Sequence, residues 1–138
     1  MQNDIYYIST KTGNKTGYHI EHILSENEAN RGYFKDVEEF EDQRNLLGGL
    51  LLLKGLDNIS SGNEEYSDKL KTYSNGLVWG HSLCENFYHA NKDFDKFNKE
   101  FSDKCNVGLK AYSVFDQNAL MERSRLLYEI VKVIWEVS

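Results

Sequence analysis

Short apolar runs separated by polar, glycine-bearing segments mark the first half of the chain. Ile5–Ser9 and Tyr18–Ile23 are rich in β-branched and aromatic residues, which favour strands. The polar segment Lys11–Gly17 between them carries two glycines and could close a hairpin. Leu50–Leu53 is a further, fully apolar run whose length favours a buried strand, although periodicity alone does not separate a short buried strand from a helix. The pattern therefore predicts a small sheet of short strands.

Helices are indicated where apolar side chains recur at three- and four-residue spacing. Asp36 can cap a short helix over Val37–Leu46, and Gly48-Gly49 ends it. A second helix is expected over Glu64–Tyr73. The remaining expectations are a polar loop at Leu56–Gly62, helical segments at Leu77–Ala90 and around Phe94, Phe97 and Phe101, an ambiguous stretch at Val107–Phe115, and a long helix over Asn118–Val137.

The long C-terminal helix is the clearest element of the second half. Its apolar side runs from Leu120 to Trp135 and includes Ile130, Val131 and Ile134. Because an amphipathic helix buries its apolar face against the rest of a domain, we expect this side to pack over the other elements as far as Trp135.

Composition narrows the class of protein. The chain has 138 residues, so a single domain over 1–138 is the expectation. Hydrophobic residues make up 40% and aromatic residues 13%, which is typical of a globular chain and not of a disordered one. No apolar run approaches the ~20 residues needed to cross a bilayer. The two cysteines, Cys84 and Cys105, have no CxxC spacing and fit free thiols in a reducing compartment, so we expect a cytoplasmic protein.

The net charge is −6 and the isoelectric point is about 5.2. An acidic domain is a poor electrostatic match for nucleic acid, because phosphate binding normally draws on Lys and Arg. A nucleic-acid function would therefore need a bound metal ion, a local basic patch or a partner domain.

Candidate chemistry centres on Tyr18–Leu24, where Glu21 directly precedes His22. A carboxylate beside an imidazole places a metal ligand next to a general base, a combination that suits phosphodiester hydrolysis. For an isolated Glu-His pair, an exposed pair on an edge strand is the more common interpretation. On a regular strand the two side chains point to opposite faces, so the strand would have to end or distort for both to reach one phosphate.

The residues downstream of the Glu-His pair favour the catalytic interpretation. Taken in order with the Glu-His pair, they resemble the HNH nuclease domain at the C-terminus of GmrSD-like type IV restriction endonucleases. The similar pieces are Glu21-His22-Ile23, Arg44-Asn45-Leu46-Leu47-Gly48-Gly49, Leu50–Leu53, Asn58, Tyr66, Lys69, Tyr73, and Glu122-Arg123 through to Trp135. The resemblance covers about residues 18–136, and the order of the pieces is more specific than any one of them.

The resemblance implies an α+β fold: a small ββα-metal (HNH) unit at about 18–73, wrapped by C-terminal helices at 77–137. It implies that His22 is the general base and that Glu21 and Asn58 hold Mg²⁺ or Mn²⁺, since carboxylate and amide oxygens suit hard cations. The implied activity is that of a divalent-metal-dependent DNA endonuclease in a restriction or phage-defence protein. In that family an N-terminal ParB-like NTPase domain commonly accompanies the nuclease domain.

Two departures from the family pattern bear on this interpretation. HNH domains commonly carry a first Asn nine residues before the ligand Asn, and here that position is Gly49. The Pro that usually follows the Glu-His-Ile stretch is replaced by Ser25. The alternative is therefore a degenerate HNH-fold module that acts in nucleic-acid binding or protein interaction without catalysis. A structural role for His22 and a turn role for Asn58 are the corresponding alternatives at the residue level.

Several other residues are weaker candidates. Lys69, Arg44 and His19 are possible phosphate contacts, although ordinary surface roles are at least as common for such residues. His81, Glu85 and His89 have the spacing of metal ligands on one helix face. Without a fourth ligand at a fitting position, we interpret that spacing as coincidence.

Overall fold

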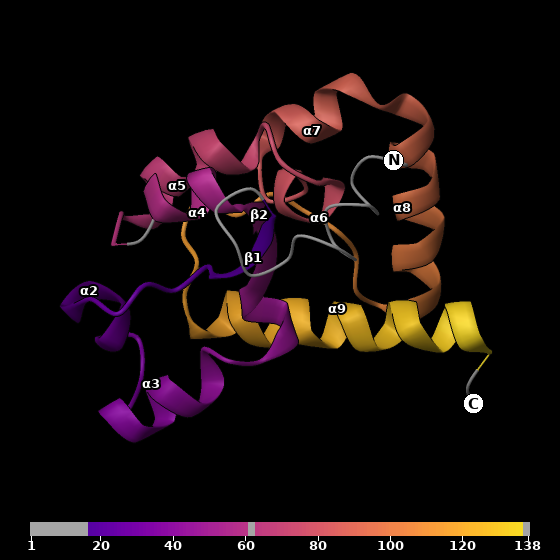
Figure 1. The fold of residues 1–138 in the computed structure, drawn as a ribbon. Coiled ribbons are helices and arrows are strands. Elements are labelled where there is room, and N and C mark those ends of the chain that lie inside the picture. The colour runs from indigo at the N-terminus through magenta and orange to yellow at the C-terminus, as the bar shows by residue number, and fades with distance from the viewer. Residues whose placement is uncertain (1–16, 61–62, 137–138) are drawn as a thin grey trace.

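The computed structural model describes residues 17–60 and 63–136, with the side chains of residues 58–60 excepted. The elements in chain order (Figure 1) are β1 (Tyr18–His22), α2 (Glu28–Arg31), α3 (Val37–Gln43), a 3-10 turn η1 (Leu47–Gly49), β2 (Leu50–Lys54), α4 (Gly55–Ser60), α5 (Tyr66–Tyr73), α6 (Val78–His81), α7 (Glu85–Ala90), α8 (Lys92–Cys105) and α9 (Gln117–Trp135). The predicted strand Ile5–Ser9 and the hairpin that would join it to β1 lie outside the described residues. The fold is α+β and mostly helical.

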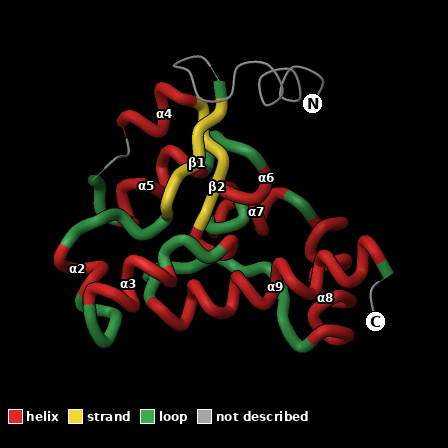
Figure 2. Tube along the Cα trace, turned by 60° about the horizontal axis from the view of Figure 1, so that its bottom comes forward, coloured by secondary structure: helices red, strands yellow, loops and turns green. Residues whose placement is uncertain are grey.

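The sheet of the described chain is a single antiparallel pair, β1 with β2 (Figure 2). Glu21 lies opposite Leu51, and His22 lies opposite Leu50. The backbone N–H of Ile23 continues the ladder past the last pair by donating to the carbonyl of Gly49 at 2.9 Å. This pairing confirms that the Glu-His run and the leucine run form one small sheet.

The two faces of this sheet differ. Along β2, burial alternates: Leu51 and Leu53 are buried and Leu52 is exposed, as expected for a strand with one face on the core. Residues paired across an antiparallel ladder share a face, so Glu21 points inward with Leu51. His22, paired with Leu50, points to the other face.

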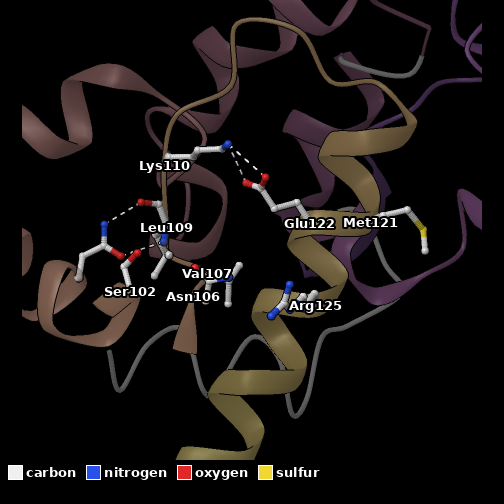
Figure 3. A pocket seen from close by; sticks show the side chains of 10 residues that line it. Ser102, Asn106, Val107, Leu109, Lys110, Met121, Glu122 and Arg125 are labelled. Atoms are coloured by element: carbon white, nitrogen blue, oxygen red, sulfur yellow. Dashed lines mark hydrogen bonds and ion pairs between the residues drawn. The ribbon is translucent and has the colours of Figure 1, made fainter. Parts of the chain in front are cut away.

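The core lies between the inner face of the sheet and the helices α3, α5 and α9. Its fully buried apolar residues come from segments far apart in the chain, namely Ile23, Leu24, Phe40, Tyr73, Leu83, Phe115 and Leu120. A smaller cluster of Phe101, Val107 and Leu126 joins α8 to α9. A hollow between these two helices is lined by residues of α8, α9 and the segment that joins them (Figure 3), and none of its lining residues comes from β1, α3 or α5.

The backbone of the turn η1 packs directly against the backbone of α9. A Cβ atom on Gly48 would lie 2.3 Å from the Ser124 nitrogen and 2.8 Å from the Arg123 carbonyl carbon. Only glycine permits this approach, which fixes the entry into β2 relative to the long helix. The buried residues of α9 are Ala119, Leu120, Arg123 and Leu126.

Other sequence expectations have mixed outcomes. The α3 helix and its cap are confirmed, since Asp36 Oδ1 accepts the Glu39 N–H at 2.9 Å. The polar loop expected at Leu56–Gly62 is wrong at its start, because α4 occupies Gly55–Ser60. Its described side chains Leu56 and Asp57 are exposed, and a polar composition does not separate a loop from an exposed helix. The single helix expected at Leu77–Ala90 is divided into α6 and α7.

The expectation that α9 buries its apolar side as far as Trp135 is wrong. Val131, Ile134 and Trp135 are exposed, at 44%, 62% and 66%. Ile130 is the last of the stripe to pack against a core cluster, that of Phe101. The periodicity identified the apolar face of the helix correctly but not the length over which other elements cover it.

Two further findings concern membranes and thiols. None of the helices in the described ranges is long and apolar enough to cross a bilayer. Cys84 and Cys105 are free, which confirms that expectation.

The Gly48 contact yields the first prediction. Gly48→Ala should lower the free energy of unfolding by ~1–3 kcal/mol, because the added methyl overlaps the α9 backbone and must force the two segments apart. Gly80→Ala is the matched control, since its Cβ would meet its nearest neighbour, Leu51 Cδ1, at an ordinary 3.6 Å. Urea unfolding of both variants measures the difference. Equal stability of the two would contradict the close approach.

Candidate functional site

The inner face of β1 carries a buried ion pair. Glu21 is 4% exposed and Lys69 is 1% exposed. Lys69 Nζ donates to Glu21 Oε1 at 2.6 Å, and the Tyr73 hydroxyl donates to the same oxygen at 3.1 Å. Lys69 and Tyr73 are four residues apart on α5, so both face the strand from one side of the helix. A carboxylate buried in the core is thus matched by a cation and a hydroxyl donor.

The Lys69 ammonium also holds the backbone at the end of β1. It donates to the His22 carbonyl oxygen at 2.8 Å and lies 3.5 Å from that of Ile23. Burial lowers the pKa of Lys69 from its ordinary value, while the bond to Glu21 acts in the opposite direction. Burial and the neighbouring Glu21 carboxylate raise the pKa of Tyr73, so its hydroxyl remains a donor at neutral pH.

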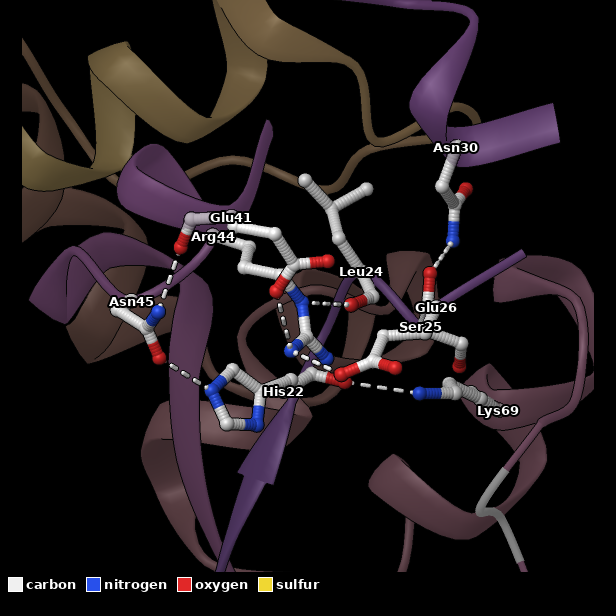
Figure 4. A network of polar contacts seen from close by, with 9 residues as sticks. All are labelled: His22, Leu24, Ser25, Glu26, Asn30, Glu41, Arg44, Asn45 and Lys69. Carbon is white, nitrogen blue, oxygen red and sulfur yellow. Dashed lines mark hydrogen bonds and ion pairs between the residues drawn. The ribbon is translucent and has the colours of Figure 1, made fainter. Parts of the chain in front are cut away.

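His22 is half-buried on the other face of the strand. Its Nε2 lies 2.8 Å from Asn45 Oδ1, just beyond the end of α3 (Figure 4). The amide of Asn45 is itself held, because Nδ2 donates to the Glu41 carbonyl oxygen at 2.6 Å. The His22 ring is therefore bonded to Asn45, just after α3. The His22 backbone is bonded to Lys69 of α5.

Arg44, the residue before Asn45, also bonds from the end of α3 to the segment that follows β1. Its Nε donates to the Leu24 carbonyl oxygen at 3.2 Å, and its Nη1 lies 3.0 Å from Glu26 Oε1 and 3.7 Å from Glu41 Oε2. The guanidinium also lies over the Phe40 ring, with Cζ 5.5 Å from its centroid. The buried side chain thus links the end of α3 to the segment that follows β1 (Figure 4).

The candidate site residues from the sequence are placed as follows. The structure brings Glu21 together with Lys69, and it separates the side chains of Glu21 and His22 by the strand. The strand distortion that would turn both toward one phosphate is not seen, since both pair regularly with β2. Asn58 lies on α4, and its side chain is outside the described part of the chain. Convergence of Glu21, His22 and Asn58 on one cation therefore stays a prediction.

The expected phosphate contacts take part in internal bonds. Lys69 donates to Glu21 and to main-chain oxygens, and Arg44 to Leu24 and Glu26. A direct phosphate contact from either side chain would require some of these bonds to break. His19 is half-buried at the position paired with Leu53.

The fit of a divalent cation can be tested on the donors themselves. A carboxylate and an amide oxygen, as in Glu21 and Asn58, have the right chemistry for Mg²⁺ or Mn²⁺. However, a cation held by Glu21 would have to share the carboxylate with the Lys69 ammonium at 2.6 Å. Among residues 17–60 and 63–136, no three His, Cys, Asp or Glu side chains gather as a metal site.

The spacing of His81, Glu85 and His89 does not form a metal site either. His81 ends α6, whereas Glu85 and His89 belong to the separate helix α7. The three residues are therefore not on one continuous helix face, so the single helix that this spacing assumed is wrong.

Packing against α9 accounts for the glycine at position 49, where HNH domains commonly carry their first Asn. A Cβ on Gly49 would lie 2.8 Å from Leu120 Cδ1 and 3.1 Å from the Arg44 carbonyl oxygen. Leu120 is fully buried, so the space that an Asn side chain would need at this position is filled by α9.

Sequence reasoning did not assign roles to two residues of this region. Tyr73 and Asn45 both appeared only as parts of the family pattern, yet one bonds Glu21 and the other bonds His22. The i, i+4 spacing of Lys69 and Tyr73 was a usable signal for the first. No local signal identifies Asn45, because its partner lies 23 residues away.

Comparison with known proteins identifies a family. The family model described as GmrSD restriction endonucleases, C-terminal domain, matches residues 2–130. No curated protein and no solved structure match the chain.

The buried ion pair yields the second prediction. Lys69→Met should cost ~3–5 kcal/mol of unfolding free energy, because it removes the counter-charge from a buried carboxylate. Lys71→Met is the matched control on the same helix, where an exposed Lys71–Asp68 pair should contribute ~1 kcal/mol or less. The double variant Lys69→Met/Glu21→Leu should recover much of the loss, since both charges are gone. Equal unfolding free energies for Lys69→Met and Lys71→Met in urea would refute the role of the pair.

Proposed function

The chain belongs to the family of GmrSD restriction endonuclease C-terminal domains, and on this premise we propose that it cleaves DNA by hydrolysing phosphodiester bonds with His22 as the general base. The observation that supports this choice is the way the imidazole is held. His22 ends β1, its ring is bonded through Nε2 to Asn45, and its carbonyl is bonded to Lys69. A base fixed at both ring and backbone is pre-positioned for proton transfer.

In the proposed step the free ring nitrogen of His22 takes a proton from a water molecule. The resulting hydroxide attacks phosphorus, and the bond from phosphorus to the 3′ oxygen breaks. The departing oxygen takes up a proton from a solvent water molecule, which leaves a 3′-hydroxyl and a 5′-phosphate. An imidazole suits this role because it exchanges protons near neutral pH.

We also propose that Glu21 and Asn58 hold a divalent cation, Mg²⁺ or Mn²⁺. When bound, such an ion would neutralise phosphate charge and stabilise the departing oxygen. Lys69 and Tyr73 both bond Oε1 of Glu21, so the cation would share the carboxylate with these two donors.

The proposal includes a partner for DNA affinity. The net charge of −6 opposes binding to a polyanion, and both Lys69 and Arg44 are engaged internally. We propose that an N-terminal ParB-like NTPase domain, in the same or a partner protein, brings the DNA to this domain, and that the protein acts in the cytoplasm in defence against phage.

The third prediction distinguishes the proposed role of His22 as general base from that of Glu21 as metal ligand. His22→Ala should lower plasmid cleavage by ~10²–10⁴-fold with Mg²⁺ or Mn²⁺, because proton transfer is lost. The affinity for Mn²⁺, measured by calorimetry, should be unchanged in His22→Ala. Glu21→Gln should instead weaken Mn²⁺ binding, and part of its activity should return at high metal concentration. His89→Ala, which replaces an exposed histidine on α7, is the control that should retain cleavage.

Urea unfolding of each variant separates loss of the site from loss of the fold. Full activity in both His22→Ala and Glu21→Gln would place the reaction elsewhere. If the wild type, joined to its N-terminal partner, cleaves no DNA with either metal, the non-catalytic HNH-fold module becomes the function to pursue.

A further inference from the structure

The Asn45 side chain bridges two elements at the candidate base. We propose that Asn45 is a positioning residue that keeps the proton of neutral His22 on Nε2 and thereby leaves Nδ1 as the basic nitrogen. The catalytic meaning of this assignment rests on the proposed function, whereas the assignment itself follows from the hydrogen bonds.

The orientation of the Asn45 amide is determined by Glu41. A backbone carbonyl oxygen only accepts hydrogen bonds, so the amide atom 2.6 Å from the Glu41 oxygen must be Nδ2. This carbonyl is available because α3 ends at Gln43, and the last carbonyls of a helix lack partners within the helix. With Nδ2 directed to Glu41, Oδ1 is the atom that faces His22.

The orientation of the amide then determines the tautomer of the imidazole. An amide oxygen also only accepts, so the ring nitrogen 2.8 Å from Asn45 Oδ1 must carry a hydrogen. A neutral imidazole has one N–H and one lone pair. Hence Nε2 holds the proton and Nδ1 holds the lone pair that a general base needs.

Other hydrogen bonds hold the backbone on which His22 and Asn45 sit. Arg44, the neighbour of Asn45, binds the Leu24 carbonyl oxygen at 3.2 Å, and Lys69 binds the His22 carbonyl oxygen at 2.8 Å (Figure 4). The end of α3 and the end of β1 are thus tied independently of the His22–Asn45 bond. Replacing Asn45 should release the ring without moving the strand.

The chain provides a matched control for the local role of Asn45. Asn75, just after α5, also donates from Nδ2 to the carbonyl four residues earlier, that of Lys71, at 3.2 Å. Both residues are exposed. Asn75 therefore makes the same helix-end bond as Asn45, at a different helix and away from His22.

The tautomer can be measured directly on the folded protein by long-range ¹H–¹⁵N correlation of the histidine side chains, at a pH where His22 is neutral. The wild type should show His22 mainly as the Nε2–H form. Asn45→Leu should shift His22 toward a mixture of the two tautomers, and Asn75→Leu should leave it unchanged. Signals of His81, which contacts Asn86 instead, should not move in either variant.

Cleavage kinetics provide the second measurement. Asn45→Leu should lower kcat by at least about tenfold with KM unchanged, because the population of the competent tautomer and its orientation are reduced. Asn45→Asp keeps an oxygen acceptor opposite Nε2 and should retain more of kcat than Asn45→Leu. Asn75→Leu should cleave as the wild type does.

The two proposals fail in different ways. A wild-type His22 in the Nδ1–H form, or a tautomer ratio that Asn45→Leu leaves unchanged, would overturn the positioning role even if the protein cleaves DNA. Absence of cleavage by a wild type with the Nε2–H tautomer would overturn the proposed function alone.

Discussion

The buried pairing of Glu21 with Lys69 is the constraint on which the region around the candidate base depends. A carboxylate on the inner face of a strand is tolerated only when a cation and hydrogen-bond donors meet it there. Lys69 meets this need from α5 and uses its remaining donor capacity on the carbonyl oxygens at the end of β1. The position of α5, the course of the strand end and the backbone of His22 are therefore coupled through a single ammonium group.

A second set of bonds completes this arrangement from the opposite side of the strand. Arg44 and Asn45 follow α3 and bind Leu24 and His22, so that the residues on either side of the strand end are held by one helix terminus. Lys69 and Arg44 bind the main chain, whereas Asn45 binds the imidazole. The main-chain position and the ring orientation of the proposed base therefore depend on different bonds, and a substitution at Asn45 is expected to affect the ring more than the fold.

Sequence patterns predicted the parts of the fold that are determined locally. The strands at Tyr18 and Leu50, the Asp36 cap and the long C-terminal helix all follow from short-range spacing, and the structure contains them. The ion pair of Glu21 joins residues 48 positions apart, so no local pattern reveals it. The exposed end of α9 was missed for a related reason, because periodicity reports which face of a helix is apolar and not what covers it. For the same reason, Gly49 looked like a lost Asn until Leu120 was seen to occupy that space.

Burial of cationic side chains further reduces the positive charge that this acidic chain can offer to DNA. Lys69 and Arg44 are buried in ion pairs, and Arg123 is fully buried against the Trp79 ring, with Cζ 3.7 Å from its centroid. Burial lowers the pKa of Arg123 to about 10, so it keeps its charge at neutral pH but offers no surface to a ligand. The positive charge that can reach a phosphate is therefore smaller than the composition indicates, and the net charge of −6 already opposes DNA.

Affinity for DNA depends on cations that displace counterions from the phosphates. A domain of this kind is therefore suited to positioning a reaction and poorly suited to capturing its substrate. Capture would then need a bound metal ion, a local basic patch or another domain, and the first and last of these are part of the proposed function.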